Sequence, residues 1–231
     1  MDFASRTIVV TGGTGALGTA VVGALLAAGA SCRVPYVHDA EMQHFADREN
    51  KQVKLIAVKD LADEADVAKL YDNVSGLWAS IHIAGGFAIA SVAATDKAAL
   101  QSQIDTNFVS CFLCCRAAIK AMGNNSGRIV NVAARPALEW RSGAGMAAYT
   151  ASKAAVAAMT VALAEEVAKD GILVNAVAPS IMDTPANRKA MPKADFAKWP
   201  KVEEVAASIV FLASPANRVT RGAIVPVYGK S

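Results

Sequence analysis

Short strand-like segments alternate with longer helical segments along this chain, and this alternation restricts the fold more than any other feature. Runs rich in Val and Ile are followed by Ala- and Leu-rich runs of helical length. Repeated β-α-β units build a parallel sheet with helices packed on its faces. Hydrophobic residues make up 54% of the 231 residues, which suits strands that are buried on both sides.

The expected elements cover the chain without a linker or an internal repeat. Strands are expected at Thr7–Thr11, Cys32–Tyr36, Val53–Val58, Trp78–Ile83, Arg128–Ala133, Leu173–Ala178 and Ile224–Val227. Helices are expected at Ala16–Ala28, Glu64–Asn73, Lys97–Met122, Met146–Lys169 and Val202–Ala213, with loops at Gly123–Gly127 and Pro179–Pro200. We therefore expect a single α/β domain over residues 1–231.

Charge and hydropathy argue against two classes of partner. The net charge is only +3 and no Lys/Arg run carries it, so nucleic-acid binding is not expected. No uninterrupted apolar stretch reaches the roughly 18 residues of a membrane span, and the N-terminus lacks the apolar core of a signal peptide. We expect no membrane partner and a cytoplasmic location.

A glycine-rich turn follows the first expected strand. Gly12, Gly15 and Gly18 lie where that strand must turn into a helix. Without Cβ atoms the backbone can approach a pyrophosphate, and the free N–H groups of a helix start bind anions. The pattern also fits a tight turn without a ligand, so it indicates dinucleotide binding only together with other motifs.

A tyrosine and a lysine are spaced to share one helix face. Tyr149 and Lys153 are four residues apart, which brings their Cβ atoms within about 5–6 Å in a helix. A nearby ammonium favours the phenolate and lowers a tyrosine pKa from its usual value of about 10. The pair can then transfer a proton, although the same spacing also describes an ordinary surface pair.

Four cysteines are interpreted as structural. Cys111, Cys114 and Cys115 lie in one apolar helical stretch, and Cys32 lies in an expected strand. Adjacent helix residues cannot both face one ion well, and no histidine lies near them in the sequence. We expect small buried side chains and no metal.

The order of these motifs resembles the short-chain dehydrogenase/reductase family over nearly the whole chain. The glycine-rich turn is similar to T-G-x-x-x-G-x-G, with Ala16 in place of one glycine. Further similar positions are Asp60-Leu61, Ala84-Gly85-Gly86, Asn107, Asn175 to Ser180, Thr184 and Gly222 to Val227. In the family's N-N-A-G motif, His82 and Ile83 replace the two asparagines.

The resemblance implies a Rossmann-type doubly wound parallel sheet of about seven strands and hydride transfer with NAD or NADP. Tyr149 would be the general acid/base, Lys153 would bind the nicotinamide ribose, and Asn107 would support a proton-relay water. Cofactor contacts are implied for Gly12, Thr14, Gly15, Leu17, Asp60, Leu61, Ala84, Gly85, Gly86, Tyr149, Lys153, Pro179 and Thr184. The partner is a small-molecule substrate, and a homo-oligomer is implied, a tetramer or a dimer.

One departure from the family pattern concerns its catalytic serine. Ala134 stands three residues after Asn131, where the family has the serine, and Ser142 is the nearest replacement. Segments 12–18, 84–87 and 134–138 resemble the dihydropteridine-reductase branch, which also lacks that serine. A dihydropteridine-reductase-like activity is therefore one alternative, and a catalytically idle NAD(P)-binding sensor or scaffold is another.

The choice between NAD and NADP stays open in the sequence. An acid at the end of the second strand favours NAD and a base favours NADP. Here Tyr36 or Val37 occupies that position, and the following His38 and Asp39 point to opposite answers.

Overall fold

Seven parallel strands form the centre of the molecule in a computed structural model that describes residues 1–231. The strands are β1 (Thr7–Thr11), β2 (Ser31–Tyr36), β3 (Val53–Ala57), β4 (Leu77–His82), β5 (Gly127–Val132), β6 (Ile172–Pro179) and β7 (Ile224–Val227). They are arranged in the order β3-β2-β1-β4-β5-β6-β7. The order reverses between β1 and β4, and in such sheets ligands bind at this switch point, beyond the carboxyl ends of the strands. The predicted Rossmann-type α/β fold is confirmed.

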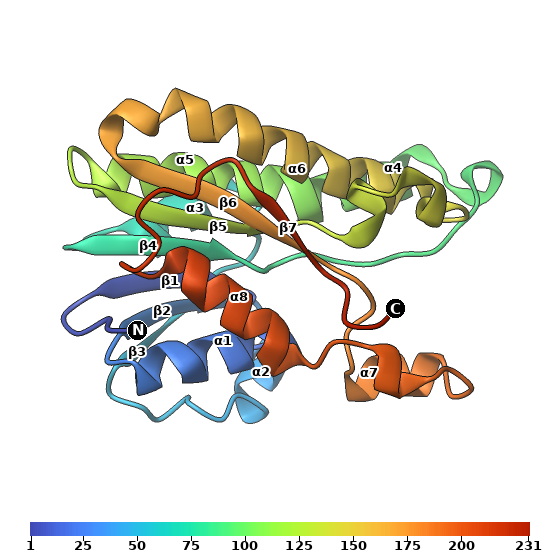
Figure 1. Cartoon of the computed structure of the whole chain (residues 1–231), viewed down its shortest axis with the longest axis horizontal. Coiled ribbons are helices and arrows are strands. Elements are labelled where there is room, and N and C mark those ends of the chain that lie inside the picture. Colours follow the sequence, from blue (N-terminus) through green and yellow to red (C-terminus); the bar gives the residue numbers. More distant parts are fainter.

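Helices cover both faces of the sheet (Figure 1). The helices are α1 (Ala16–Ala27), α2 (Asp39–Gln43), α3 (Glu64–Tyr71), α4 (Lys97–Ile104), α5 (Ser110–Met122), α6 (Ala147–Glu166), α7 (Pro185–Ala190) and α8 (Val202–Ala213). On one face, α1 and α8 pack through buried residues such as Leu25 and Ile209. On the other, α3, α5 and α6 bury Leu70, Met122 and Val156. Two apolar layers therefore hold the strand ends in fixed positions.

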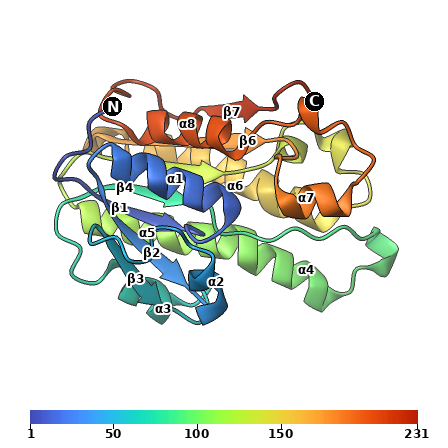
Figure 2. The same cartoon turned by 90° about the horizontal axis from the view of Figure 1, so that it is seen from below.

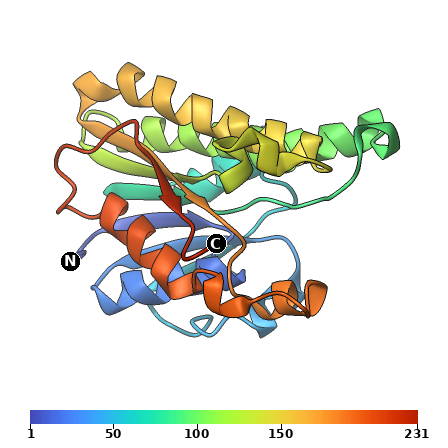
Figure 3. The ribbon, with the colours of Figure 1, turned by 45° about the vertical axis from the view of Figure 1, so that its right-hand side comes forward.

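Two segments flank the edge at which the strands end. Residues 83–96, between β4 and α4, extend away from the sheet beyond its carboxyl edge (Figure 3). The short helix α7 lies beside the same end of the molecule (Figure 2). Ile83 to Gly85 of the first segment and Asn187 of α7 line a cavity at this edge of the sheet.

The expected helix over Lys97–Met122 has an irregular centre. Residues Asp105–Val109 form a π-helical turn between α4 and α5. Such turns in helices frequently occur at functional sites, and this one contains the buried Asn107. The hydrophobic pattern continues across the turn, so the sequence alone indicated one unbroken helix.

Two short helices lie in segments where no helix was expected. Residues 179–200 were predicted to be a loop, but α7 begins after Thr184, whose hydroxyl accepts a hydrogen bond from the N–H of Asn187. Pro185 at the first helical position completes a start signal that was overlooked. The other short helix, α2, begins after His38.

One helix is long and apolar enough, by length and composition, to cross a membrane, whereas the sequence reading expected none. This helix is α6, with 20 residues. Its inner side contributes Val156 and Ala164 to the core beside the sheet, and Lys153 is also buried. We therefore describe α6 as a partly buried core helix of the α/β fold.

Candidate active site

The turn between β1 and α1 requires glycine at two positions for folding and leaves a third open to a ligand. Gly12 has a φ of +68°, and a Cβ there would lie 2.7 Å from the backbone nitrogen of Ala84. A Cβ at Gly18 would collide with the backbone of Gly12 and Gly13. At Gly15, the exposed N-cap of α1, a Cβ would meet only the carbonyl oxygen of Gly12, at 3.4 Å. Gly15 therefore keeps the helix start accessible.

A cavity of about 580 Å³ opens over this turn. Its lining includes eight of the predicted cofactor-binding residues: Gly12, Thr14, Gly15, Leu17, Leu61, Ala84, Gly85 and Thr184. The lining residues run from the glycine-rich turn past Tyr36 to Val58, the residue after β3. Free N–H groups at the start of α1 and an apolar wall beyond β2 suit a dinucleotide, with phosphates at the turn and an adenine beside Leu61.

The other five predicted cofactor-binding residues do not line this cavity: Asp60, Gly86, Tyr149, Lys153 and Pro179. The Asp60 carboxylate is exposed and accepts a hydrogen bond from the N–H of Ala62, at 2.8 Å, within the turn before α3. Pro179 is buried as the last residue of β6. Of the predicted Asp60-Leu61 pair, only Leu61 faces the cavity in this structure.

Valine at position 15 is expected to weaken dinucleotide binding without unfolding the protein. The structure leaves room for this Cβ, so the branched side chain would fill the approach to the helix start rather than clash with Ala84. We expect the Kd for the dinucleotide to rise by at least about tenfold, or about 1.4 kcal/mol. Gly23→Val, in the same helix but outside the cavity, is the control. Equal affinity in the two folded variants would contradict a phosphate site at this turn.

Asn107 joins three parts of the site. Its amide nitrogen donates to the carbonyl oxygen of Gly86 at 3.0 Å and to Ser152 Oγ at 3.1 Å. Its Oδ1 accepts from the N–H of Gly86 at 3.0 Å. The predicted Gly86 is thus held by two hydrogen bonds to Asn107. Because Ser152 lies between Tyr149 and Lys153 on α6, Asn107 fixes the loop after β4 against the helix that carries the Tyr/Lys pair.

Tyr149 and Lys153 lie on α6 without a hydrogen bond between them. The Lys153 ammonium donates to the carbonyl oxygen of Val132 at 2.8 Å, at the end of β5. Burial lowers the pKa of Lys153 to about 8. The Tyr149 ring meets Phe87 edge-to-face, with ring centroids 5.0 Å apart. Burial raises the pKa of Tyr149 to about 12, opposite in direction to the lowering expected from the neighbouring ammonium.

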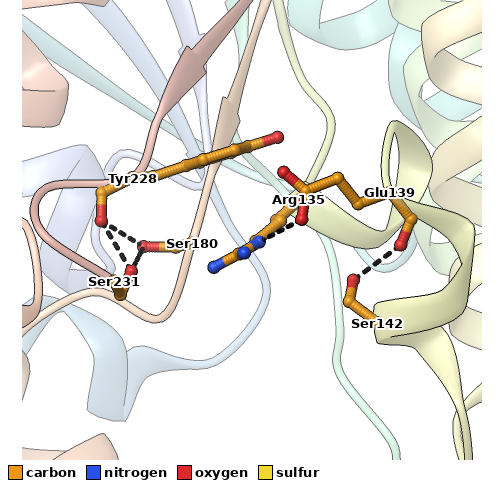
Figure 4. A network of polar contacts seen from close by, with 6 residues as sticks. All are labelled: Arg135, Glu139, Ser142, Ser180, Tyr228 and Ser231. Atoms are coloured by element: carbon orange, nitrogen blue, oxygen red, sulfur yellow. Dashed lines mark hydrogen bonds and ion pairs between the residues drawn. The ribbon is translucent and has the colours of Figure 1, made fainter.

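The segment after β5 is held by a network of polar contacts (Figure 4). Arg135 donates to the Glu139 carboxylate at 2.7 Å, and its guanidinium lies over the ring of Tyr228, 4.9 Å from the centroid. Ser142 donates its hydroxyl to the backbone carbonyl of Glu139 at 2.7 Å (Figure 4). The Ser142 side chain is exposed and its hydroxyl is already paired, while Ala134 is buried two residues after β5.

Glu41 is a residue of the cavity that sequence reasoning missed. Its Oε2 accepts from the hydroxyl of Thr14 at 2.7 Å, and its Oε1 accepts from the backbone N–H groups of Val37 and His38. The carboxylate lines the cavity beside the end of β2. The signal available in the sequence was a capping box, since Glu41 is the third residue of α2 after His38.

These features define an α/β oxidoreductase domain with a dinucleotide cleft at the carboxyl edge of its sheet. The family model described as short chain dehydrogenase matches residues 6–195. The chain belongs to the short-chain dehydrogenase/reductase family and is an NAD(P)-dependent oxidoreductase of that family.

Several known proteins are similar to the chain over almost its whole length. It is 34% identical to a cis-4-hydroxycyclohexanecarboxylate dehydrogenase of Sinomonas cyclohexanicum, over 98% of this chain and 96% of that protein. It is 33% identical to a galactitol 2-dehydrogenase of Rhizobium johnstonii, over 95% and 92% of the two chains. Among solved structures, a glucose/ribitol-type short-chain dehydrogenase from Brucella melitensis superimposes with a TM-score of 0.89, at 27% identity over 99% and 98% of the chains.

Proposed function

We propose that the chain is a reductase of a small carbonyl, imine or electron-poor ring compound, with Tyr149 as the proton donor. The observation that carries this proposal is the assembly around α6. Asn107 fixes the loop after β4 against α6. Tyr149 and Lys153 lie on this helix, and Lys153 donates to Val132 at the carboxyl end of β5. A scaffold that only bound a dinucleotide would have no chemical need for all three side chains.

Each of the three side chains has a distinct task in this proposal. The Tyr149 phenol, whose pKa burial raises to about 12, is protonated at neutral pH, and it becomes a better donor to a developing oxygen or nitrogen anion when that pKa is lowered. Lys153 would bind the nicotinamide ribose and lower the tyrosine pKa once that ribose is held. Asn107 acts as a positioning residue through Gly86 and Ser152. The dinucleotide, when bound, supplies the hydride.

The absence of a side-chain hydrogen-bond donor at Ala134 favours one class of substrate over another. A ketone needs its developing oxyanion stabilised while hydride arrives, and Ala134 offers no side-chain donor for this. Ser142 is an unsuitable replacement because its hydroxyl is bonded to the Glu139 carbonyl oxygen. An electron-poor ring or imine spreads the incoming charge over its own atoms, so we propose such a substrate, as in the dihydropteridine-reductase branch. The half-buried Tyr149 and the exposed Phe87 offer aromatic surface beside it.

Steady-state NADH oxidation tests this choice. The panel contains an oxidised dihydropteridine, activated quinones, diketones and simple ketones. We expect the largest kcat/KM for the electron-poor ring compounds. Faster reduction of simple ketones would contradict the proposed substrate class and would indicate a bound water as the missing donor. In that case the cyclic and sugar-alcohol dehydrogenases similar to this chain would be the better guides to substrate.

We further propose that NAD(H) is preferred over NADP(H), because Glu41 lines the adenosine side of the cavity. A carboxylate accepts hydrogen bonds from a ribose hydroxyl and repels a phosphate. No lysine or arginine lines this cavity to compensate that repulsion. The backbone N–H groups of Val37 and His38 and the Thr14 hydroxyl all donate to Glu41, so they fix the position of its side chain in the cavity.

Glu41→Gln is expected to reduce the preference for NAD(H) over NADP(H). Glutamine keeps one acceptor oxygen for the capping box at the start of α2, replaces the other carboxylate oxygen by an NH2 group and removes the charge. We expect the NAD(H)-to-NADP(H) ratio of kcat/KM to fall by about tenfold, mainly through a lower KM for NADP(H), as roughly 1.4 kcal/mol of repulsion is removed. Asp39→Asn removes a neighbouring exposed acid outside the cavity and should leave the ratio unchanged. An unchanged ratio in Glu41→Gln would exclude this residue as the determinant.

The outer side of the helical layer supports a homo-oligomer, which we propose to be a tetramer or a dimer. Leu100 of α4, Phe112 of α5 and Val161 of α6 are between 43% and 46% exposed. Ala157 of the same helix α6 is buried against Ala133 within the chain and is not available to a partner subunit. Light scattering that gives a monomer mass at micromolar concentration would contradict this proposal. The proposed location stays cytoplasmic.

A further inference from the structure

A cluster of soft donor atoms lies in the core, away from the dinucleotide cavity. His82 is the last residue of β4, and Cys111 and Cys115 lie one turn apart on the face of α5 that covers this strand. Their ligand atoms, His82 Nδ1 and the two Sγ atoms, lie within 4.8 Å of one another, and all three residues are buried. No histidine is near these cysteines in the sequence, but the fold brings His82, which is 29 residues before Cys111, into contact with them.

An amide oxygen completes the cluster as a fourth corner. Asn131 Oδ1, on β5, lies 2.8 Å from His82 Nδ1, 3.3 Å from Cys111 Sγ and 3.5 Å from Cys115 Sγ. Its orientation is fixed because the amide nitrogen of Asn131 donates to Thr160 Oγ1 at 2.9 Å. Three side chains thus converge on one oxygen that has only two lone pairs.

The imidazole of His82 is held from its other side. Its Nε2 lies 2.8 Å from Ser80 Oγ and 3.3 Å from the hydroxyl of Tyr71. Metal-binding histidines almost always have such a partner on the second ring nitrogen, which orients the ring and fixes its tautomer. On the other side of the ring, Nδ1 lies 2.8 Å from Asn131 Oδ1, 3.4 Å from Cys115 Sγ and 4.0 Å from Cys111 Sγ.

The geometry points to a buried Zn²⁺ site formed by His82, Cys111 and Cys115, with Asn131 Oδ1 in the fourth position. In tetrahedral zinc sites, bonds of roughly 2.0–2.3 Å separate nitrogen and sulfur ligands by about 3.6 Å. The two separations here, 3.4 Å and 4.0 Å, bracket that value. The 2.8 Å between His82 Nδ1 and Asn131 Oδ1 is a hydrogen-bond distance, so these two atoms must move apart to about 3.4 Å when the ion binds. Two thiolates neutralise one Zn²⁺, so the buried site carries no net charge. Sulfur and imidazole ligands also disfavour Mg²⁺ and Ca²⁺.

A zinc ion here would be structural. It would link α5 to β4 and β5. The site would lie about one helical turn after Asn107, which is buried in the π-helical turn before α5, as Cys111 is buried in α5. Side chains would fill all four coordination positions of the ion, so no open position would remain for a substrate or water. Because the residues are buried, the ion must enter while the chain folds, and its binding free energy adds to the stability of the fold.

Cys114 offers a matched control on the same helix. It is buried like the other two cysteines, but it is not a member of the cluster. We compare the wild-type chain with Cys115→Ser and Cys114→Ser after unfolding and refolding each with and without Zn²⁺. The wild type and Cys114→Ser should retain on the order of one zinc per chain after gel filtration and gain thermal stability from it. Cys115→Ser should lose at least about tenfold in zinc affinity.

Refolding the wild type with Co²⁺ gives a test that does not depend on any variant. Two thiolate ligands would produce an intense thiolate-to-cobalt charge-transfer absorption and the visible bands of a tetrahedral ion. The proposal would be overturned if the refolded wild-type chain retained no more zinc than the buffer control, had the same Tm with and without Zn²⁺, and showed no cobalt–thiolate absorption. The four groups would then form only a hydrogen-bonded cluster.

Discussion

Replacing Tyr149 by phenylalanine is expected to lower kcat by about 10²–10⁴-fold, the usual contribution of a positioned general acid. The substitution removes only the hydroxyl. The ring can keep its edge-to-face contact with Phe87, at 5.0 Å between centroids, so α6 and the loop after β4 should stay in position. Steady-state kinetics with the best substrate of the panel measures the loss, and fluorescence titration with NADH should give a Kd close to that of the wild type.

A second tyrosine at the same edge of the sheet provides the control. Tyr228 follows β7 and lies over Arg135 rather than beside Phe87. Tyr228→Phe also removes one phenol hydroxyl and should retain most of the activity. If Tyr149→Phe kept nearly full kcat, the proton would come from another group and our assignment would be wrong.

Restoring a hydroxyl at position 134 is expected to raise ketone reduction by up to about 10²-fold, the value of one oxyanion donor. Ala134 is buried and extended two residues after β5, with φ −161° and ψ 160°. Ala134→Ser adds a donor where the family pattern has its serine. The gain should be much smaller for an electron-poor ring, which needs less help in stabilising the arriving charge. The measurement is kcat/KM for one ketone and one ring compound in both proteins.

Ala137→Ser, which also adds a hydroxyl at a buried alanine of this segment, should change kcat/KM for neither the ketone nor the ring compound. An equal gain for ketone and ring in Ala134→Ser would mean that the missing donor does not determine the substrate class. Fast ketone reduction by the wild type, with no further gain, would mean that another donor already fills this role.

The sequence predicted the sheet almost to the residue, because parallel strands buried on both faces are continuous apolar runs. The first and last strands, Thr7–Thr11 and Ile224–Val227, have the predicted bounds. Short helices were harder to predict. Both α2 and α7 have 6 residues or fewer, so no hydrophobic repeat can develop, and only their capping residues mark them. The π-helical turn at Asp105–Val109 leaves the hydrophobic pattern unchanged and was invisible for that reason.

The candidate site was predictable where a local motif carries it and unpredictable where the fold assembles it. The glycine-rich turn and the Tyr149/Lys153 pair are each contained within one segment. Glu41 reaches Thr14, 27 residues earlier, only after β2 and α2 have formed. His82 meets Cys111 only because α5 packs on β4. The pKa of Tyr149 was also expected to be lowered by the Lys153 ammonium, but burial of the phenol raises it.

A single-turnover experiment tests most directly whether this chain is a reductase and not an idle dinucleotide-binding protein. Chain in excess over NADH is mixed with an oxidised dihydropteridine, and loss of the reduced nicotinamide absorbance is followed. We predict that the wild type oxidises all of the bound NADH in one exponential phase, while Tyr149→Phe binds NADH and oxidises it at least about 10²-fold more slowly. Wild-type chain that binds NADH but oxidises none of it, with this ring or with any quinone, diketone or ketone of the panel, would contradict the account.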